Sequence, residues 1–159
     1  MISKKVGISP KNDNYARLAE YIADAGHEGE KSLMHWCAGC LGDDDYRDGI
    51  AEAMDVQAMN TRTKQSKTYH LVISFRPEDE AKLTPEVFKA IEERFAAALG
   101  YTEHQRHCGV HKNTANLHMH IAYNMISIEL SHGVRGCAKS TLFQEIINAM
   151  QVRQSTKGQ

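Results

Sequence analysis

The stretch Asn116–Asn124, NLHMHIAYN, decides the fold of this chain of 159 residues. Every second side chain in it is apolar: Leu117, Met119, Ile121 and Tyr123. This alternation predicts a β-strand with one face packed against a core. His118 and His120 lie on the opposite face, where imidazole rings are not needed to fill a core.

The preceding stretch RHCGVHK, residues 106–112, predicts a second strand that is joined to the first by a turn around KNTAN. An antiparallel return of the chain brings His111 beside His118 or its diagonal neighbour His120. His118 and His120 are separated by about 6.6 Å along a strand, close enough for both rings to bind one ion. The pattern His-x6-His-x-His therefore predicts a three-histidine metal site with open coordination positions, as in catalytic sites. The alternative is three surface histidines without a ligand.

Around this hairpin, the sequence predicts strands near residues 2–7, 32–41 and 67–75 and helices near 14–25, 43–59 and 84–99. The last helix has the clearest boundaries, with Thr84 as N-cap, Pro85 at its first position and Gly100 at its end. These elements predict the α+β class: a central antiparallel sheet with helices packed on its one apolar face. We expect one domain over residues 1–130 and a divergent or truncated C-terminal segment over 131–159.

Composition excludes several classes of protein. The hydrophobic content of 42% suits one globular domain. No apolar run approaches the roughly 18 residues of a membrane span, and the N-terminus lacks a signal core, so we expect a soluble, intracellular protein. A net charge of −1 argues against coating nucleic acid by charge alone. Arg62, Lys64 and Lys67 nevertheless lie in an acid-free stretch, which indicates either a local basic patch or a solvated loop.

Four cysteines are present, two of them in the motif CAGC at positions 37–40. This motif resembles a redox site, but the next predicted helix starts too late to activate the first thiolate. Cys108 and Cys137 complete no recognisable zinc spacing with it. We therefore expect all four side chains to be largely buried thiols in a reducing compartment.

Two tyrosines lie in the predicted helix near residues 14–25, and they differ in position. Tyr15 belongs to its apolar stripe, whereas Tyr21 falls outside that stripe. An aromatic residue at such a position is commonly incidental. If Tyr21 faces the predicted metal site, however, its hydroxyl is a candidate nucleophile.

Four segments together carry a resemblance to a known family: ARLAEYIAD (16–24), NTRTKQSKTYHLVISFRPEDE (60–80), ALGYTEHQR (98–106) and VHKNTANLHMHIA (110–122). They resemble the relaxase domain of conjugative plasmids, and most closely the IncP-plasmid type within the histidine-hydrophobe-histidine endonucleases. The resemblance runs from about residue 14 to residue 126. It rests on a tyrosine helix, a strand serine and a triple-histidine hairpin in the family's order.

The resemblance implies a site- and strand-specific DNA nicking and religating enzyme that acts in plasmid mobilisation. Tyr21 would be the nucleophile that forms a 5′-phosphotyrosyl bond, and Ser74 would contact DNA beside the scissile phosphate. His111, His118 and His120 would hold a divalent metal, Mg or Mn with Zn as an alternative, or would help to activate the tyrosine.

The implied partners are single-stranded DNA at an origin of transfer and accessory DNA-binding proteins, in the bacterial cytoplasm and away from membranes. Arg62, Lys64 and Lys67 are the expected DNA-binding cations.

Asn113 motivates a second hypothesis. The family usually has His-x-Asp where this chain has His111-Lys112-Asn113, and an amide lacks the charge that strengthens a metal-bound imidazole. The alternative is a catalytically weak or silent relaxase remnant that binds single-stranded DNA. A three-histidine metal oxygenase of barrel type is disfavoured by the strong helices.

Overall fold

The computed structural model describes residues 1–24, 31–41, 45–113 and 116–127. Strands and helices alternate over most of this length. In chain order the elements are β1 (Ile2–Val6), η1 (Pro10–Asn12), α1 (Tyr15–Asp24), β2 (Lys31–Ala38), α2 (Tyr46–Met59), β3 (Thr68–Ser74), η2 (Pro77–Lys82), α3 (Pro85–Leu99), β4 (Arg106–Lys112) and β5 (Leu117–Asn124), where η marks a short 3-10 helix.

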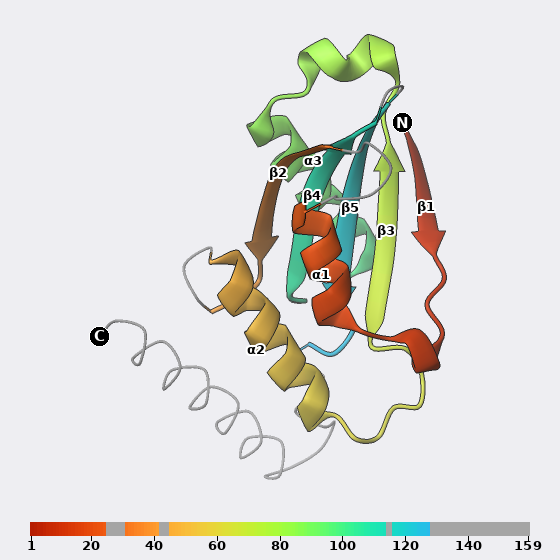
Figure 1. Cartoon of the computed structure of the whole chain (residues 1–159), viewed down its shortest axis with the longest axis vertical. Coiled ribbons are helices and arrows are strands. Elements are labelled where there is room, and N and C mark those ends of the chain that lie inside the picture. Colours follow the sequence, from red (N-terminus) through yellow and green to blue (C-terminus); the bar gives the residue numbers. More distant parts are fainter. Residues whose placement is uncertain (25–30, 42–44, 114–115, 128–159) are drawn as a thin grey trace, which may run out of the picture.

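The strands form one sheet in the order β1-β3-β5-β4-β2, and every neighbouring pair is antiparallel (Figure 1). β5, which carries the stretch NLHMHIAYN, lies in the centre between β3 and β4. β4 and β5 form the predicted hairpin, and His111 lies opposite His118 in their register. The predicted antiparallel sheet is therefore confirmed.

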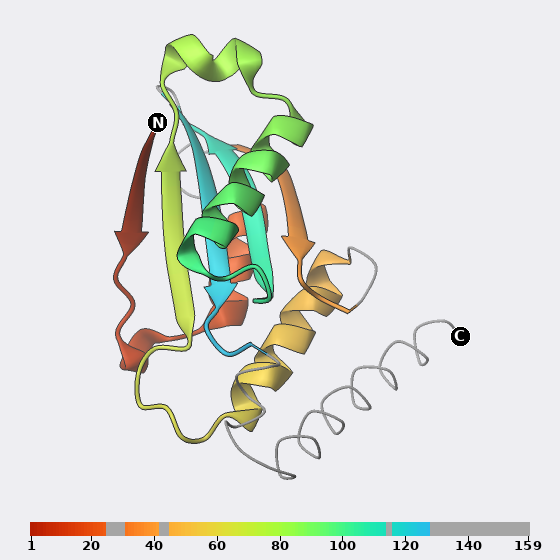
Figure 2. The same cartoon turned by 180° about the vertical axis from the view of Figure 1, so that it is seen from behind.

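Helices cover both faces of this sheet (Figures 1 and 2). The predicted apolar face of β5 packs with Phe88 and Ala96 of α3, and α3 crosses that face in Figure 2. α1 and α2 pack on the opposite face, where Ala122 of β5 belongs to their core. The α+β class and the helix-covered apolar face are as predicted, and α1 and α2 form an additional layer on the histidine face.

Capping side chains explain where the helices begin and end. The hydroxyl oxygen of Thr84 accepts a hydrogen bond from the Val87 N–H at 3.3 Å, at the start of α3. Gly100 ends that helix in the left-handed conformation, with φ of 77°, which favours glycine. Both ends were predicted. At the start of α2, the Asp45 carboxylate accepts from the Asp48 N–H at 3.1 Å.

None of the helices in the described ranges is long and apolar enough to cross a membrane. The segment that we expected to be divergent or truncated, residues 131–159, lies outside the described residues.

Helix α1 lies close against the sheet at Gly109 of β4. A Cβ atom built on Gly109 would lie 2.6 Å from Cγ2 of Ile22 and 2.7 Å from its carbonyl oxygen. Carbon atoms do not pack at such distances, so the helix backbone would have to move away from the sheet. Glycine at this position allows α1 to pack directly against the backbone of β4.

We predict that Gly109→Ala destabilises the fold by about 1–3 kcal/mol, because the added methyl group overpacks the contact with Ile22. Gly7→Ala is the matched control, since a Cβ atom at Gly7 has nothing within 4 Å. The measurement is the free energy of unfolding in urea for the wild type and both variants. Equal stability of Gly109→Ala and Gly7→Ala would contradict the close approach.

Candidate functional site

A row of polar side chains crosses the three central strands on the face covered by α1. The register pairs His118 with both His111 and Ser74, and pairs His120 with Gly109. Cross-strand partners point to the same face, as do alternate residues of one strand. The set therefore comprises His70 and Ser74 of β3, His111 of β4, and His118 and His120 of β5. The predicted pairing of His111 with His118 is confirmed.

His111 connects the sheet to α1. It is fully buried, and its Nε2 lies 2.6 Å from the carbonyl oxygen of Ile22. That carbonyl belongs to the last turn of α1, where no N–H group of the helix donates to the backbone oxygens. Because a carbonyl can only accept, Nε2 carries the proton and the ring's lone pair is on Nδ1. One hydrogen bond thus fixes both the helix end and the tautomer.

His120 and His70 form a second buried pair. Nε2 of His70 and Nδ1 of His120 are 3.1 Å apart. Burial and the neighbouring His111 lower the pKa of His120 to about 3 and that of His70 to about 4. Both rings are therefore neutral near neutral pH. Nε2 of His120 is buried and makes no hydrogen bond to the described residues. If Nδ1–H of His120 donates to Nε2 of His70, the lone pair of His120 is on Nε2, where it can bind a metal ion or accept a proton.

His118 lies at the edge of this cluster and contacts Ser74 and Asn113. The side-chain oxygen of Asn113 accepts from the Asn116 N–H at 2.8 Å, which directs its NH₂ group to Nε2 of His118 at 3.1 Å. Nε2 of His118 is then an acceptor, and Nδ1–H donates to the Ser74 hydroxyl at 3.1 Å. Both ring nitrogens of His118 are thus engaged within the protein.

Tyr21 lies above the histidines. Its ring is half-buried and meets the rings of His111 and His120 edge-on, at centroid distances of 5.5 and 5.7 Å. The centroids of His111 and His120 are themselves 4.5 Å apart. Tyr15 is fully buried in the α1 core, as predicted. The structure therefore brings Tyr21 to the two histidines of the predicted site that are most deeply buried.

The three hairpin histidines are not equally ready to bind one metal ion. Within the described residues, the one set of three potential ligands whose donor atoms all lie within 4.8 Å of one another is Cys37, Cys40 and His107. The donor atoms of the three hairpin histidines lie farther apart, because the ring of His118 is directed toward Ser74 and Asn113. The ring centroids of His111 and His120 lie 4.5 Å apart, whereas His118 would have to rotate to bind the same ion.

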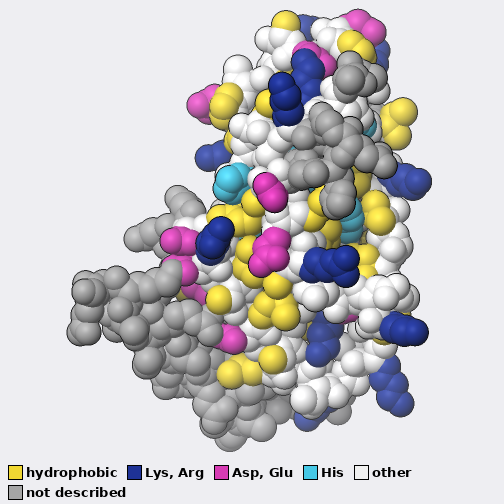
Figure 3. All heavy atoms as spheres, in the orientation of Figure 1, with side chains coloured by type: hydrophobic (Ala, Val, Ile, Leu, Met, Phe, Trp, Pro, Cys, Tyr) yellow, Lys and Arg dark blue, Asp and Glu magenta, His cyan; other side chains and the backbone are white. Residues whose placement is uncertain are grey.

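The predicted basic residues lie away from this cluster. Arg62 and Lys64 are exposed, in the loop before β3, and Ser74 lies at the other end of that strand, about 20 Å from Thr68 at 3.3 Å per residue. Lys67 donates from Nζ to the carbonyl oxygens of Gln57 and Asn60, at 2.9 and 2.6 Å, and so caps α2. Figure 3 shows that Lys and Arg side chains on this face are interspersed with Asp and Glu.

Sequence comparison places these residues in a known family. The family model described as Relaxase, MobA/VirD2-like, nuclease domain matches residues 21–154, more than half of the chain. The chain belongs to this family. The match begins at Tyr21 and spans Ser74 and the three hairpin histidines. It also runs past residue 131, into the segment that we expected to be divergent.

Relatives of this relaxase domain are much longer. Two Escherichia coli proteins, both named Protein TraI, are 42% identical to it over 127 residues, which is 79% of this chain and 17% of each relative. The chain thus spans less than a fifth of these relatives. The solved structure "MobM Relaxase Domain (MOBV; Mob_Pre) bound to 26nt pMV158 oriT DNA" aligns with 96% of this chain and 86% of that one, at 12% identity and a TM-score of 0.42.

Sequence analysis missed His70, although a signal for it was present. Residues 68–74 alternate so that His70, Val72 and Ser74 share one face. The alternation alone does not show that β3 pairs with β5, and this pairing brings His70 to His120.

We predict that Asn113→Asp moves the proton of neutral His118 from Nδ1 to Nε2, because a carboxylate can only accept a hydrogen bond. The measurement is the ¹⁵N chemical shifts of the imidazole nitrogens by NMR. His111 is the internal control, since the Ile22 carbonyl holds its proton on Nε2 in both proteins. A wild-type His118 already protonated on Nε2 would contradict the hydrogen-bond network.

Proposed function

We propose that this relaxase domain nicks and rejoins one DNA strand at an origin of transfer, through a covalent bond between Tyr21 and a 5′ phosphate. The observation that carries this proposal is the position of Tyr21, whose ring contacts His111 and His120 on the buried histidine face. Membership of the relaxase nuclease family supports the same chemistry. The domain would comprise residues 1–130, with the C-terminal segment contributing to it or to DNA binding.

In the proposed step, the Tyr21 oxygen attacks the scissile phosphorus in line. The bond between the phosphorus and the tyrosine oxygen forms, and the bond between the phosphorus and the 3′ oxygen breaks. The phenol proton passes to a neutral imidazole, with Nδ1 of His111 and Nε2 of His120 as the candidate acceptors. The 3′ oxygen leaves with the electron pair of the broken bond and takes up a proton from water, so that it becomes a hydroxyl. One phosphodiester replaces another, so the reverse step rejoins the strand.

We also propose a divalent cation at this site, Mg or Mn with Zn as an alternative. His111 and His120 would hold it, and His118 would join them by turning away from Asn113. When bound, such an ion polarises a phosphate oxygen and stabilises the charge that develops on it. The buried Nε2 of His120 supports this assignment.

The proposed substrate is single-stranded DNA, presented in the bacterial cytoplasm by accessory proteins that open the duplex. Ser74 would contact the phosphate next to Tyr21. Its hydroxyl oxygen accepts from Nδ1–H of His118, so the hydroxyl hydrogen can donate to a phosphate oxygen. Arg62 and Lys64 would bind the backbone some distance along the strand. Lys67 is better explained as the cap of α2 than as a DNA contact.

A weak or silent DNA-binding remnant is the second candidate function, and the contact of Asn113 with His118 favours it. The amide donates to the lone pair of Nε2 that a metal would need. An aspartate would instead accept a hydrogen bond from Nε2–H of His118 and strengthen the imidazole as a ligand through Nδ1.

We predict that the wild type, incubated with an origin-of-transfer oligonucleotide and Mn²⁺ or Mg²⁺, forms a protein–DNA adduct that survives denaturing electrophoresis. Tyr21→Phe should form none, because it lacks the attacking oxygen. EDTA should suppress the wild-type adduct if the cation is needed.

Tyr69→Phe is the matched control, since Tyr69 packs with the α3-side core, away from the histidines. It should retain the adduct. Tyr15→Phe is less suitable, because the Tyr15 hydroxyl is bonded to buried His107 at 2.6 Å. An adduct with Tyr21→Phe would refute the nucleophile, and its absence from the wild type on cognate DNA would favour the remnant.

A separate prediction concerns the DNA path. Reversing the charges of Arg62 and Lys64 to Glu should weaken single-stranded DNA binding and flatten the plot of log K against log salt by about 0.7 for each lost phosphate contact. Lys89→Glu with Arg94→Glu on α3 is the charge-matched control and should leave the slope unchanged. A slope that responds only to the α3 variant would place the DNA on the other face of the sheet.

A further inference from the structure

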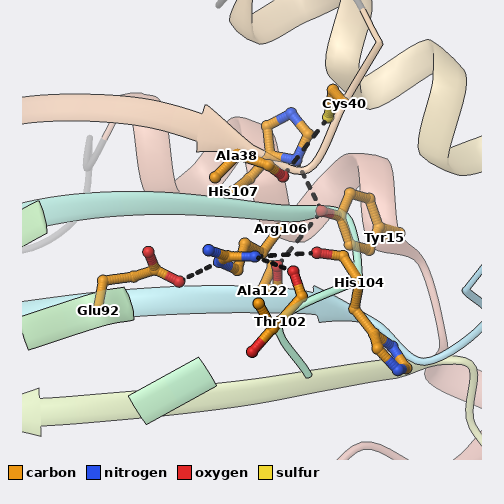
Figure 4. Close-up of polar contacts among 9 residues, drawn as sticks. All are labelled: Tyr15, Ala38, Cys40, Glu92, Thr102, His104, Arg106, His107 and Ala122. Carbon is orange, nitrogen blue, oxygen red and sulfur yellow. Dashed lines mark hydrogen bonds and ion pairs between the residues drawn. The ribbon is translucent and has the colours of Figure 1, made fainter. Parts of the chain in front are cut away.

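A second group of potential metal ligands lies on the same face of the sheet, near the start of α2. Cys37 of β2 is the cross-strand partner of His107 of β4. Gly39 then adopts a left-handed conformation, with φ of 75°, and the turn carries Cys40 back toward His107. The donor atoms of Cys37, Cys40 and His107 all lie within 4.8 Å of one another. Figure 4 shows Cys40 beside the ring of His107.

Gly49 of α2 keeps the space beside these ligands open. A Cβ atom at Gly49 would lie 2.9 Å from Nε2 of His107 and 3.0 Å from Sγ of Cys40. Any larger residue would displace one of the two ligands. The helix therefore packs over this group without filling it.

Tyr15 fixes the orientation of the His107 ring. The Tyr15 hydroxyl lies 2.6 Å from Nδ1 of His107 and 3.3 Å from the carbonyl oxygen of Ala122 (Figure 4). As the residues lie, the Tyr46 carbonyl accepts from Nε2–H of His107 at 2.9 Å, so Nδ1 accepts from the Tyr15 hydroxyl. An ion bound at Nε2 would move the ring proton to Nδ1, which would then donate to Tyr15, and Tyr15 in turn to Ala122. A hydrogen bond on the far nitrogen is the usual support for a metal-bound histidine.

We propose that Cys37, Cys40 and His107 form a metal site for a soft divalent ion, Zn²⁺ above all. Two thiolates and one imidazole are ligands that zinc prefers, whereas Mg²⁺ and Mn²⁺ prefer oxygen. Tetrahedral zinc places its ligands about 3.5–3.8 Å apart, so the half-buried Cys40 turn has to close only slightly. Water would complete the shell, and the Tyr46 carbonyl would lose the hydrogen bond that it accepts from Nε2–H of His107.

The role of this site is structural. A bound ion would connect the end of β2 to β4, at the start of α2, and would act through Tyr15 on the first turn of α1. The inference goes beyond the proposed strand transfer and does not depend on it. The sequence motif alone gave no third ligand, because His107 lies far along the chain from CAGC.

The test uses the full chain, purified without a histidine tag and kept reduced with a phosphine. Zinc content is measured by plasma mass spectrometry. Co²⁺ is then added to the metal-stripped chain, and absorption from thiolate-to-cobalt charge transfer is recorded. We expect a thiolate band in the wild type and at least one zinc per chain. Cys37→Ser and Cys40→Ser should each lose the band and one equivalent of zinc, and Tyr15→Phe should weaken Co²⁺ affinity by roughly 10–100-fold.

The matched control is Cys108→Ala combined with Cys137→Ala, which removes the other two thiols and should retain the band. His120→Ala should also retain it, which separates this site from the histidine cluster. Circular dichroism checks folding, and Cys40→Ser remains informative if Cys37→Ser fails to fold, because Cys40 lies in a half-buried turn. The proposal is overturned if the reduced wild type shows no band, if the band survives loss of both Cys37 and Cys40, or if these two form a disulfide under the same reductant.

Discussion

The hydrogen bond from His111 to the Ile22 carbonyl is the contact on which the candidate active site depends. It requires α1 to lie against the backbone of β4, and Gly109 provides the necessary space. Since Tyr21 precedes Ile22, the same contact holds its ring over His111 and His120. A helix that stood farther from the sheet would carry Tyr21 away from the imidazoles, which would then have no tyrosine hydroxyl beside them.

The protein sets the protonation of each histidine through a different partner. A carbonyl holds the proton of His111 on Nε2, His70 occupies one nitrogen of His120, and Asn113 with Ser74 engages both nitrogens of His118. Burial keeps His70 and His120 neutral by lowering the pKa of each. The lone pair of a neutral His111 is therefore on Nδ1, and that of His120 is on Nε2 if Nδ1–H donates to His70. The tautomer of His118 depends on Asn113.

Local patterns in the sequence predicted the hairpin, the α3 caps and the placement of Tyr15, because each depends on residues close together in the chain. The resemblance to relaxases added Tyr21 and Ser74. Contacts that depend on strand order were missed: His70 reaches His120 through the β3–β5 pairing, and His107 reaches the CAGC motif through β2–β4. Lys67 was predicted to contact DNA because of its charge, and its hydrogen bonds to the carbonyl oxygens at the end of α2 could not be seen in the sequence.

The central claim is that Tyr21, and no other tyrosine, is held where it can attack DNA. The most direct test traps the adduct on a cognate oligonucleotide, digests the protein with trypsin and the DNA with nuclease, and sequences the modified peptide by mass spectrometry. Cleavage after Arg17 and Lys31 places Tyr21 in a peptide separate from Tyr15. The account predicts a nucleotide remnant on Tyr21 in the peptide of residues 18–31. A remnant on any other peptide would contradict it.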